Sequence, residues 1–336
     1  MYGCNPMVNM DLSETVAATS RDATLRRFTL GDRRFRLMTQ LAAFLVVAIF
    51  AGIIVTLYIG AAPAIKAFGW DFLVTSTWNP VTEKFGAFPL IYGTLVTSAL
   101  AMIVAVPVGI GIAIFLTELC PRQLKRPIGI AVELLAGIPS IIYGIWGFFI
   151  FAPFFQSTVE PWLISIFANI PVLEDMFAGP PYGIGIFTAA LILSIMILPF
   201  ISAVTRDVFA TVPPILKEAA YGLGCTTWEV MWRIVLPYSR SGVVGGAMLA
   251  LGRALGETMA VTFVVGNAHH INMSLLAPGT TISAAIANEF SEALGELYIP
   301  SLIYAGLILF FITFLVLAAA QLMLRSLDRR SGGGSK

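Results

Sequence analysis

The sequence predicts an all-α membrane protein with six transmembrane helices, and three observations carry this prediction. First, 58% of the 336 residues are hydrophobic and 12% are charged, whereas soluble proteins carry about 25% charged residues. Second, six apolar stretches reach the roughly 20 residues that a helix needs to cross a bilayer. Third, these stretches are continuous, whereas the strands of a membrane barrel alternate over about ten residues. The composition therefore excludes a soluble fold and favours a helical bundle.

The spans follow an Arg-bearing N-terminal tail, residues 1–38. Because the first apolar run is long enough to anchor the chain, we expect it to be kept rather than cleaved as a signal. Pro107, Pro139 and Pro199 lie within predicted spans, where neighbouring helices satisfy the freed carbonyl groups. The transmembrane domain, 39–324, contains spans at 39–62, 90–117, 128–154, 183–205, 242–266 and 300–324.

Lysine and arginine are distributed unevenly between the two ends of these spans. Seventeen of the 20 lie in the N-terminal tail, in the loops after spans 2 and 4, and in the C-terminal tail, residues 325–336. The loops after spans 3 and 5 have none and carry acidic residues instead: Glu160, Glu174, Asp175, Glu289, Glu292 and Glu296. Since cytoplasmic loops of membrane proteins are rich in cations, both termini are predicted to be cytoplasmic.

Charge, cysteine and histidine content exclude several other functions. The net charge of +1 provides no basic surface for nucleic acid. The three cysteines, Cys4, Cys120 and Cys225, lie on the predicted cytoplasmic side, where thiols stay reduced. His269 and His270 are adjacent in an outer loop, where we expect them to be solvated. No Cys or His pair has the spacing of a metal site, so no metal is predicted.

The most informative segment is the cytoplasmic loop at 206–241. Its pattern is Glu-Ala-Ala, three residues, Gly, nine residues and Ile-x-Leu-Pro, carried by Glu218, Ala219, Ala220, Gly224, Ile234, Leu236 and Pro237. Residues 214–221 favour a helix, glycines at 222 and 224 allow a tight turn, and 226–234 form a second, amphipathic helix. Such a helical knob fits a groove on another protein; alternatively, its Trp228 and Trp232 lie among lipid headgroups.

The fifth span carries charges that are costly inside a bilayer. Arg253 lies near its midpoint, where an arginine costs about 3 kcal/mol on insertion scales, and Glu257 follows four residues later. On one continuous helix the two side chains share a face. They form a structural ion pair, or a site where the guanidinium binds an oxyanion and Glu257 holds it when empty; the two are compatible. Gly252 and Gly256 form a small-residue strip on an adjacent face, which allows another helix to approach.

Glu133 lies near the cytoplasmic end of the third span, ahead of Gly137-Ile138-Pro139-Ser140. We predict that it makes a structural or gating contact with an arginine or lysine on that side, rather than a contact with substrate.

Several phrases together resemble the PstC-type permeases of bacterial phosphate-specific (Pst) ABC importers, which are binding-protein-dependent ABC permeases with an EAA loop. Besides the 206–241 loop, the phrases are Gly93-Thr94-Leu95-Val96-Thr97-Ser98, Phe115-Leu116-Thr117-Glu118-Leu119, 133–140, Arg206-Asp207-Val208-Phe209, 252–261 and Ala287-Asn288-Glu289-Phe290. The resemblance runs from about residue 41 to 325. It implies a type I ABC importer permease fold in the bacterial inner membrane, with the loop as coupling helix and with Arg253 and Glu257 serving phosphate translocation.

The resemblance also implies partners: a sister permease subunit in a heterodimer, two copies of an ATP-binding subunit and a periplasmic phosphate-binding protein. The sequence contains no G-x-x-x-x-G-K-[ST] phosphate loop. The chain is therefore predicted to be no enzyme by itself, and the partner would use ATP and Mg. The predicted function is passage of inorganic phosphate. Alternatives are an ABC permease for another oxyanion (molybdate or sulfate), an ATP-independent transporter or channel, and a scaffold that reports phosphate transport to a signalling regulator.

Overall fold

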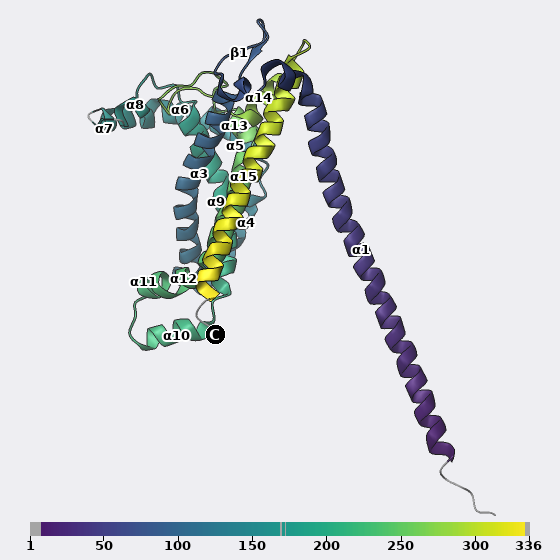
Figure 1. Ribbon diagram of the computed structural model, residues 1–336. Coiled ribbons are helices and arrows are strands. Elements are labelled where there is room, and N and C mark those ends of the chain that lie inside the picture. Colours follow the sequence, from purple (N-terminus) through teal and green to yellow (C-terminus); the bar gives the residue numbers. More distant parts are fainter. Residues whose placement is uncertain (1–7, 169, 172, 333–336) are drawn as a thin grey trace, which may run out of the picture. The chain divides into compact units, whose positions relative to one another are not determined.

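The computed structural model describes residues 8–168, 170–171 and 173–332, and its elements carry the labels of Figure 1. The chain divides into two units, residues 1–59 and 60–336, which are described separately. Helix α1, Val8–Phe68, crosses the division. Among the described residues, six helices are long and apolar enough to cross a membrane, as the sequence predicts: Arg34–Phe68, Phe88–Leu119, Ser140–Phe167, Ile186–Ala210, Thr227–Leu255 and Tyr298–Leu324.

The second unit begins with the last turns of α1 and a small hairpin. Helix α2, Asp71–Val74, precedes the antiparallel strands β1, Trp78–Asn79, and β2, Lys84–Phe85. Their apolar side chains form one cluster with α3, α14 and α15, which contains the buried Phe72, Phe85, Ala87, Leu90, Ile282, Ala285, Ala305 and Ile308. We call this part of the molecule the hairpin end.

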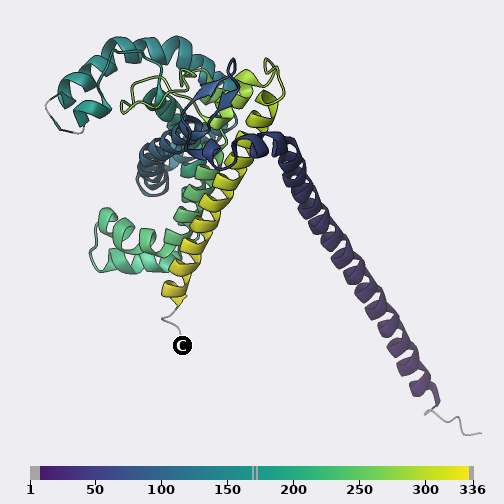
Figure 2. The ribbon, with the colours of Figure 1, turned by 45° about the horizontal axis from the view of Figure 1, so that its top comes forward.

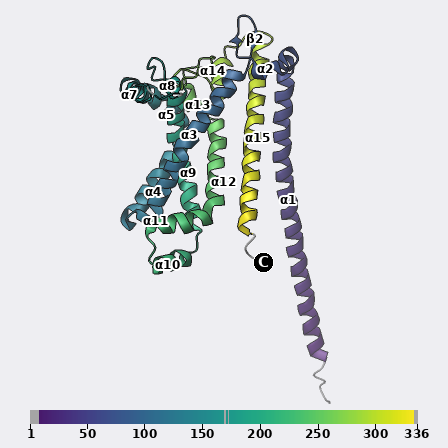
Figure 3. The same ribbon diagram turned by 60° about the vertical axis from the view of Figure 1, so that its left-hand side comes forward.

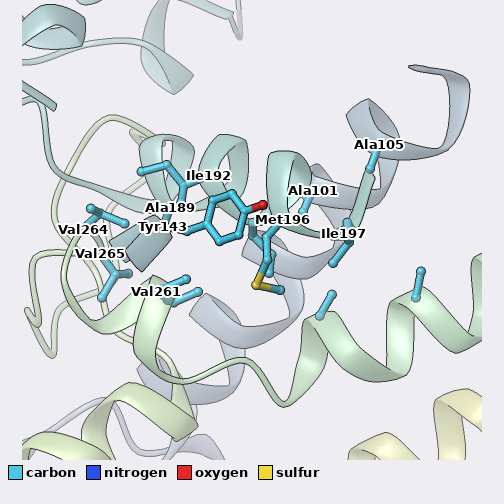
Figure 4. Close-up of a cluster of buried hydrophobic side chains, with 14 of the residues drawn as sticks. Ala101, Ala105, Tyr143, Ala189, Ile192, Met196, Ile197, Val261, Val264 and Val265 are labelled. Atoms are coloured by element: carbon cyan, nitrogen blue, oxygen red, sulfur yellow. The ribbon is translucent and has the colours of Figure 1, made fainter. Parts of the chain in front are cut away.

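Helix α9, Ile186–Ala210, forms the centre of the second unit and is the most buried of the six spans. It packs against α3, Phe88–Ile114, which continues as the π-helical turn η1, Phe115–Leu119. Alanines of α3 meet isoleucines of α9, and Tyr143 lies among Ile192, Met196 and Val261 (Figure 4). The chain's many small residues therefore allow close helix packing, as is typical of membrane bundles.

The third predicted span, 128–154, differs from the structure at both ends. Helix α4, Arg122–Ala136, is a separate amphipathic helix, and it ends because Pro139 disfavours helical backbone at the residue before it. The span then runs from α5, Ser140–Trp146, through η2, Gly147–Phe151, α6, Ala152–Phe154, η3, Phe155–Val159, and α7, Glu160–Phe167. Figure 2 shows this curved helix turning aside before α8, Leu173–Met176.

The helices that follow α9 complete the second unit. They are α10, Pro214–Gly222, α11, Thr227–Val230, η4, Met231–Val235, α12, Leu236–Leu255, α13, Met259–Thr262, α14, Ile282–Glu289, and α15, Tyr298–Gly332. Figures 1 and 3 both place α10 and α11 at the opposite end of the unit from the hairpin. We call this the loop end.

Candidate functional site

The fifth predicted span is interrupted where its charges lie. Helix α12 ends at Leu255 and α13 begins at Met259, so the prediction of one continuous helix over 242–266 is wrong. Gly256 ends α12, because glycine is a poor helix former. A carboxylate oxygen of Glu257 then accepts the backbone N–H of Ala260 at 3.3 Å, which satisfies a free donor at the start of α13. The spacing of four residues therefore does not place Glu257 on the helix face of Arg253.

Arg253 occupies the last turn of α12, where the helix dipole favours a cation. Its side chain is exposed, and it lies near enough to Tyr143 to interact with it electrostatically. Among the described residues, no carboxylate lies within ion-pair distance of Arg253, so the structural pair with Glu257 is not formed in this conformation. The guanidinium is therefore available to an anion.

Glu257 instead borders a small cavity between α3, α9 and the break between α12 and α13. The residues that line it are Thr94, Thr97, Ser98, Leu193, Ala254, Leu255, Glu257, Val261 and Thr281. Three of the four hydroxyl groups come from the phrase at 93–98, which the sequence singles out without a role, and the fourth belongs to Thr281. A side chain at Gly93 would overlap the carbonyl oxygen of Thr280, so glycine is needed for α3 to approach this loop.

Of the two glycines in the predicted small-residue strip, one lies at a contact between helices and the other does not. Gly252 faces Leu317 of α15, where a Cβ atom would make ordinary contact at 3.4 Å, and α12 packs along α15 as predicted for a small residue. Gly256 lies beyond the helix and is exposed. The strip is therefore shortened to a single helical position.

Glu133 makes the contact with a cation that the sequence predicts. Its carboxylate accepts a hydrogen bond from the Arg206 guanidinium at 2.7 Å, which joins α4 to α9. Asp207 is a second partner of the same guanidinium at 3.2 Å. The pair fixes α4 against the central helix, and its role in gating stays a prediction.

The loop between α9 and α12 contains the two helices that the sequence predicts. Helix α10 ends in a Schellman turn: the N–H of Cys225 bonds to Ala220 O at 3.1 Å and the N–H of Gly224 to Tyr221 O at 3.0 Å. Gly224 has φ +87°, a conformation that favours glycine. Thr226 and Glu229 form a capping box at the start of α11. The second helix does not stop near residue 234, however, but continues without interruption into α12.

The predicted coupling residues divide into buried and exposed sets. Ala220 packs with Val230, Met231 and Val235 under the loop, and Ile234 and Leu236 are half-buried at its edge. Glu218, Ala219, Gly224 and Pro237 are exposed. Large apolar side chains are exposed around them: Ile215 is 71%, Leu223 86% and Trp228 65% exposed. The loop is therefore folded on one side and offers an apolar surface on the other.

One contact at the loop end could not be predicted from the sequence. Lys217 of α10 donates to Glu118 of η1 at 2.6 Å, and both side chains are largely buried. This pair ties the loop to the end of the second span. Glu118 belongs to the phrase at 115–119 that the sequence singles out, but nothing in the sequence indicates its partner 99 residues away.

At the hairpin end, Glu289 gathers partners from three other segments. It accepts hydrogen bonds from Trp78 at 2.8 Å and Tyr298 at 2.7 Å, and its other oxygen pairs with His269 at 2.6 Å. Burial alone opposes ionisation, but these donors together outweigh it and hold the pKa of Glu289 below its ordinary value. His269 is therefore stacked and paired rather than solvated, in contrast to its exposed neighbour His270.

Glu160 also differs from its predicted place in an acidic outer loop. It is fully buried, and one carboxylate oxygen accepts the backbone N–H of Gly183 at 2.9 Å. Glu174, Asp175, Glu292 and Glu296 are exposed. The acidic surface at the hairpin end is therefore smaller than the sequence count indicates.

Six membrane-spanning helices, a polar break at the end of the fifth and an exposed helical loop at one end define a membrane transport permease. Residues 105–332 match the model of the family described as binding-protein-dependent transport system inner membrane component. The chain belongs to this family, and within it to the PstC-type permeases. It is accordingly a multi-pass inner membrane protein and a transport subunit rather than an enzyme.

The relatives cover nearly the whole chain. A phosphate transport system permease protein PstC from Mesorhizobium japonicum is 65% identical over 94% of this chain and 96% of its own length. The protein of the same name from Pasteurella multocida is 56% identical over 89% of this chain and 93% of its own. A probable PstC from Methanocaldococcus jannaschii is 38% identical over 84% of this chain and 90% of its own.

Solved structures support the fold. One chain of a bacterial alginate ABC transporter in complex with its alginate-bound periplasmic protein has a TM-score of 0.57 at 21% identity, over 85% of this chain and 94% of that chain. A second structure of a bacterial alginate importer gives a TM-score of 0.53 at 19% identity, over 87% of this chain and 99% of that chain. The type I ABC importer permease fold expected from the sequence is confirmed.

Proposed function

We propose that this chain is the membrane permease subunit of an ATP-driven phosphate importer and that, with a sister permease, it forms the path for inorganic phosphate. The observation that carries the proposal is the 65% identity, over 94% of the chain, to a phosphate transport system permease. The cation distribution orients the chain with both termini and the loop end in the cytoplasm. Two ATP-binding subunits and a periplasmic phosphate-binding protein complete the complex, and the ATP-binding subunits use ATP and Mg.

The loop end is the docking surface for the ATP-binding subunit. Ile215 on α10, Leu223 in the turn and Trp228 on α11 are all exposed. An interfacial helix presents one apolar face to lipid, whereas these side chains come from two helices and the turn between them. A groove in a protein accommodates such a knob better than a flat headgroup layer does.

Force from this surface reaches the polar break through one helix. Residues 227–255 are helical throughout, with α11 and η4 lying across the end of α12 (Figure 3) and Arg253 in the last turn of α12. At 1.5 Å per residue α12 is about 30 Å long. A movement of the loop therefore displaces Arg253 and the start of the break directly, without passing through a flexible connection.

Charge at the two ends of the path fits delivery by a carrier. The exposed acidic residues at the hairpin end (Glu174, Asp175, Glu292 and Glu296) repel free phosphate, so capture from solution is unfavourable and a docked binding protein supplies the anion. Inside, the exposed guanidinium of Arg253 matches the geometry of phosphate oxygens. One arginine per permease gives a weak site from which the anion is released.

The test is phosphate uptake in proteoliposomes that contain the whole complex. ATP is supplied on the side of the membrane where the ATP-binding subunits lie. We expect Arg253→Gln to lower uptake about tenfold or more, because a charge-assisted hydrogen bond to the anion is lost, while the complex still assembles. Arg253→Lys keeps the positive charge but loses the planar guanidinium that binds two oxygens at once, and it should retain part of the activity. Arg122→Gln removes a cation from exposed α4 and serves as the control. Normal uptake by Arg253→Gln would remove Arg253 from the path.

The same vesicles separate the alternatives. To test molybdate and sulfate as the true substrate, each is added as a competitor at the concentration used for phosphate. Strong inhibition of phosphate uptake by one of them would indicate a permease for that oxyanion. Uptake that persists without ATP, with the proton gradient held, would indicate a secondary transporter or channel. A chain that supports phosphate signalling but no uptake in any condition would be a scaffold for the regulator.

A further inference from the structure

The cavity beside Glu257 contains more hydroxyl groups than its packing requires. Thr97 and Ser98 of α3 and Thr281 at the start of α14 all line it, and each is at most 5% exposed. Three polar groups on one side of a buried cavity are costly unless something binds them. The cavity lies within the bundle, one turn of chain beyond Arg253, and nothing described above uses these hydroxyls.

The hydrogen bonds of the described residues show which hydroxyl groups of the cavity donate to no acceptor. A threonine in a membrane helix usually donates to the carbonyl four residues earlier, and Thr94, Thr117 and Thr313 all do so in this chain. Thr97 does not: its hydroxyl is buried and has no partner among the described residues. Ser98 makes no such bond within the described chain either, and Thr281 only accepts, from the N–H of Ala284 at 3.2 Å.

The acidic side chain of the cavity has the opposite character. Glu257 is an acceptor when ionised, and only one of its oxygens is bonded, to the N–H of Ala260. An anion without a proton would be repelled by this carboxylate. An oxyanion that keeps a proton at neutral pH can donate that proton to Glu257 while its other oxygens accept from the hydroxyls. Hydrogen phosphate and dihydrogen phosphate have such a proton, as does arsenate, whereas sulfate and molybdate do not.

We propose that Thr97, Ser98 and Thr281 donate to, and Glu257 accepts from, a protonated tetrahedral oxyanion in a subsite that selects phosphate over sulfate. This inference rests on the proposed function and adds the residues that confer selectivity. In the present conformation the enclosed part of the cavity has room for about one water molecule. The subsite is therefore closed here, and an oxyanion fits it only when the cavity widens.

The first experiment measures phosphate uptake and binding with the whole complex. Thr97→Val has nearly the same shape but no donor, and we expect about tenfold weaker binding of inorganic phosphate to the purified complex. Thr97→Ser restores the hydroxyl and should restore binding. The matched control is Thr205→Val, because Thr205 is also buried with an unpartnered hydroxyl but does not line the cavity. If Thr97→Val does not assemble, Ser98→Ala replaces it.

The second experiment tests selectivity by competition against radiolabelled phosphate, on the complex without its binding protein so that the carrier's own preference does not intervene. With the native chain, arsenate should compete and sulfate should not. With Glu257→Gln, whose amide also donates, sulfate should compete at concentrations at least about tenfold lower than with the native chain. Unchanged phosphate binding by both Thr97→Val and Ser98→Ala, or equal sulfate competition with and without Glu257→Gln, would overturn the subsite.

The two levels of proposal fail differently. If the native complex takes up no phosphate, the proposed function is wrong. If it takes up phosphate and the hydroxyl variants match it, only the subsite is wrong.

Discussion

Single residues at the hairpin end show how charge is held in place. Glu289 joins Trp78 of β1, His269 of the loop after α13 and Tyr298 of α15 through one carboxylate. The aromatic rings of this cluster also stack, with Trp78 and His269 5.5 Å apart between centroids. The carboxylate therefore stabilises the packing of three segments that close one end of the bundle.

Because the pKa of Glu289 is lowered in the folded protein, its ionised form contributes stability above its ordinary pKa of about 4.5. That contribution is lost as the pH falls through the lowered value. We expect the native chain to lose thermal stability as the pH falls below about 4.5, whereas Glu289→Gln begins lower at pH 7, by about 1–2 kcal/mol, and changes less with pH. The measurement is the melting temperature of the detergent-solubilised complex from pH 3 to 8.

Glu292→Gln provides the comparison, because Glu292 is exposed three residues further on. Its melting temperature should follow that of the native chain at every pH. A Glu289→Gln profile parallel to the native one would show that the carboxylate does not hold this end together.

The partners of single residues are the part of the site that the sequence could not predict. Trp78 and Glu289 are separated by 211 residues, and Lys217 and Glu118 by 99. Their pairing depends on how the helices pack, which no local pattern records. The charge of Arg253 and the hydroxyls at 94, 97 and 98 are visible in the sequence. The sequence does not show that Arg253 is exposed while the hydroxyls line a closed cavity.

At the scale of elements, apolar length predicted the number of spans and missed two breaks within them. The chain stays apolar through Gly137-Ile138-Pro139 and nearly so through Gly256-Glu257-Thr258, so hydropathy continues where the helix stops. Non-helical backbone at membrane depth is tolerated where protein surrounds it. Both breaks also lie in phrases that carry the family resemblance, and the second one holds the candidate site.

The loop at 206–241 is the element most fully predicted, because its signals are local. A helix over 214–221, a glycine turn and a second helix all occur as expected. The continuation of that second helix into α12 was not predicted, since Pro237 suggests an end. Proline inside a helix removes one backbone hydrogen bond and kinks the helix, however, and π-helical η4 directly before it accommodates the kink.

The exposed surface of this loop leads to a prediction about the docking of the ATP-binding subunit. Glu218 is exposed and forms no ion pair within the described chain, so Glu218→Lys should leave the fold intact. We expect the ATP-binding subunit to be retained about tenfold less well, because the charge reversal falls within the apolar docking surface. Co-purification from membranes and phosphate uptake measure the two effects.

Glu174→Lys makes the same charge change in exposed α8, at the other end of the bundle (Figure 1). It should leave association with the ATP-binding subunit unchanged. Normal association and uptake with Glu218→Lys would mean that the loop end does not dock the ATPase.

At the scale of the whole molecule, a single helix joins the loop end to the break that holds the candidate site. The hydrophobic cluster under the loop holds the start of this helix, and the central core around α9 holds its end. Lys217 and Glu118 add a second connection between the loop and α3. A rigid helix anchored at both ends transmits displacement even where it bends, whereas a non-helical joint would absorb it.

This rigidity can be tested with Leu249→Pro in α12. Leu249 is 63% exposed, so the change affects the helix more than the core: proline removes a backbone hydrogen bond and costs about 3 kcal/mol or more in a helix interior. We expect the ATP-binding subunit to remain bound and to hydrolyse ATP, while phosphate transported per ATP falls about tenfold because loop movement no longer reaches Arg253. Leu249→Ala shortens the same side chain without breaking the helix and should transport normally. Uptake and hydrolysis are measured in the same proteoliposomes, and an unchanged ratio in Leu249→Pro would show that force enters the bundle by another route.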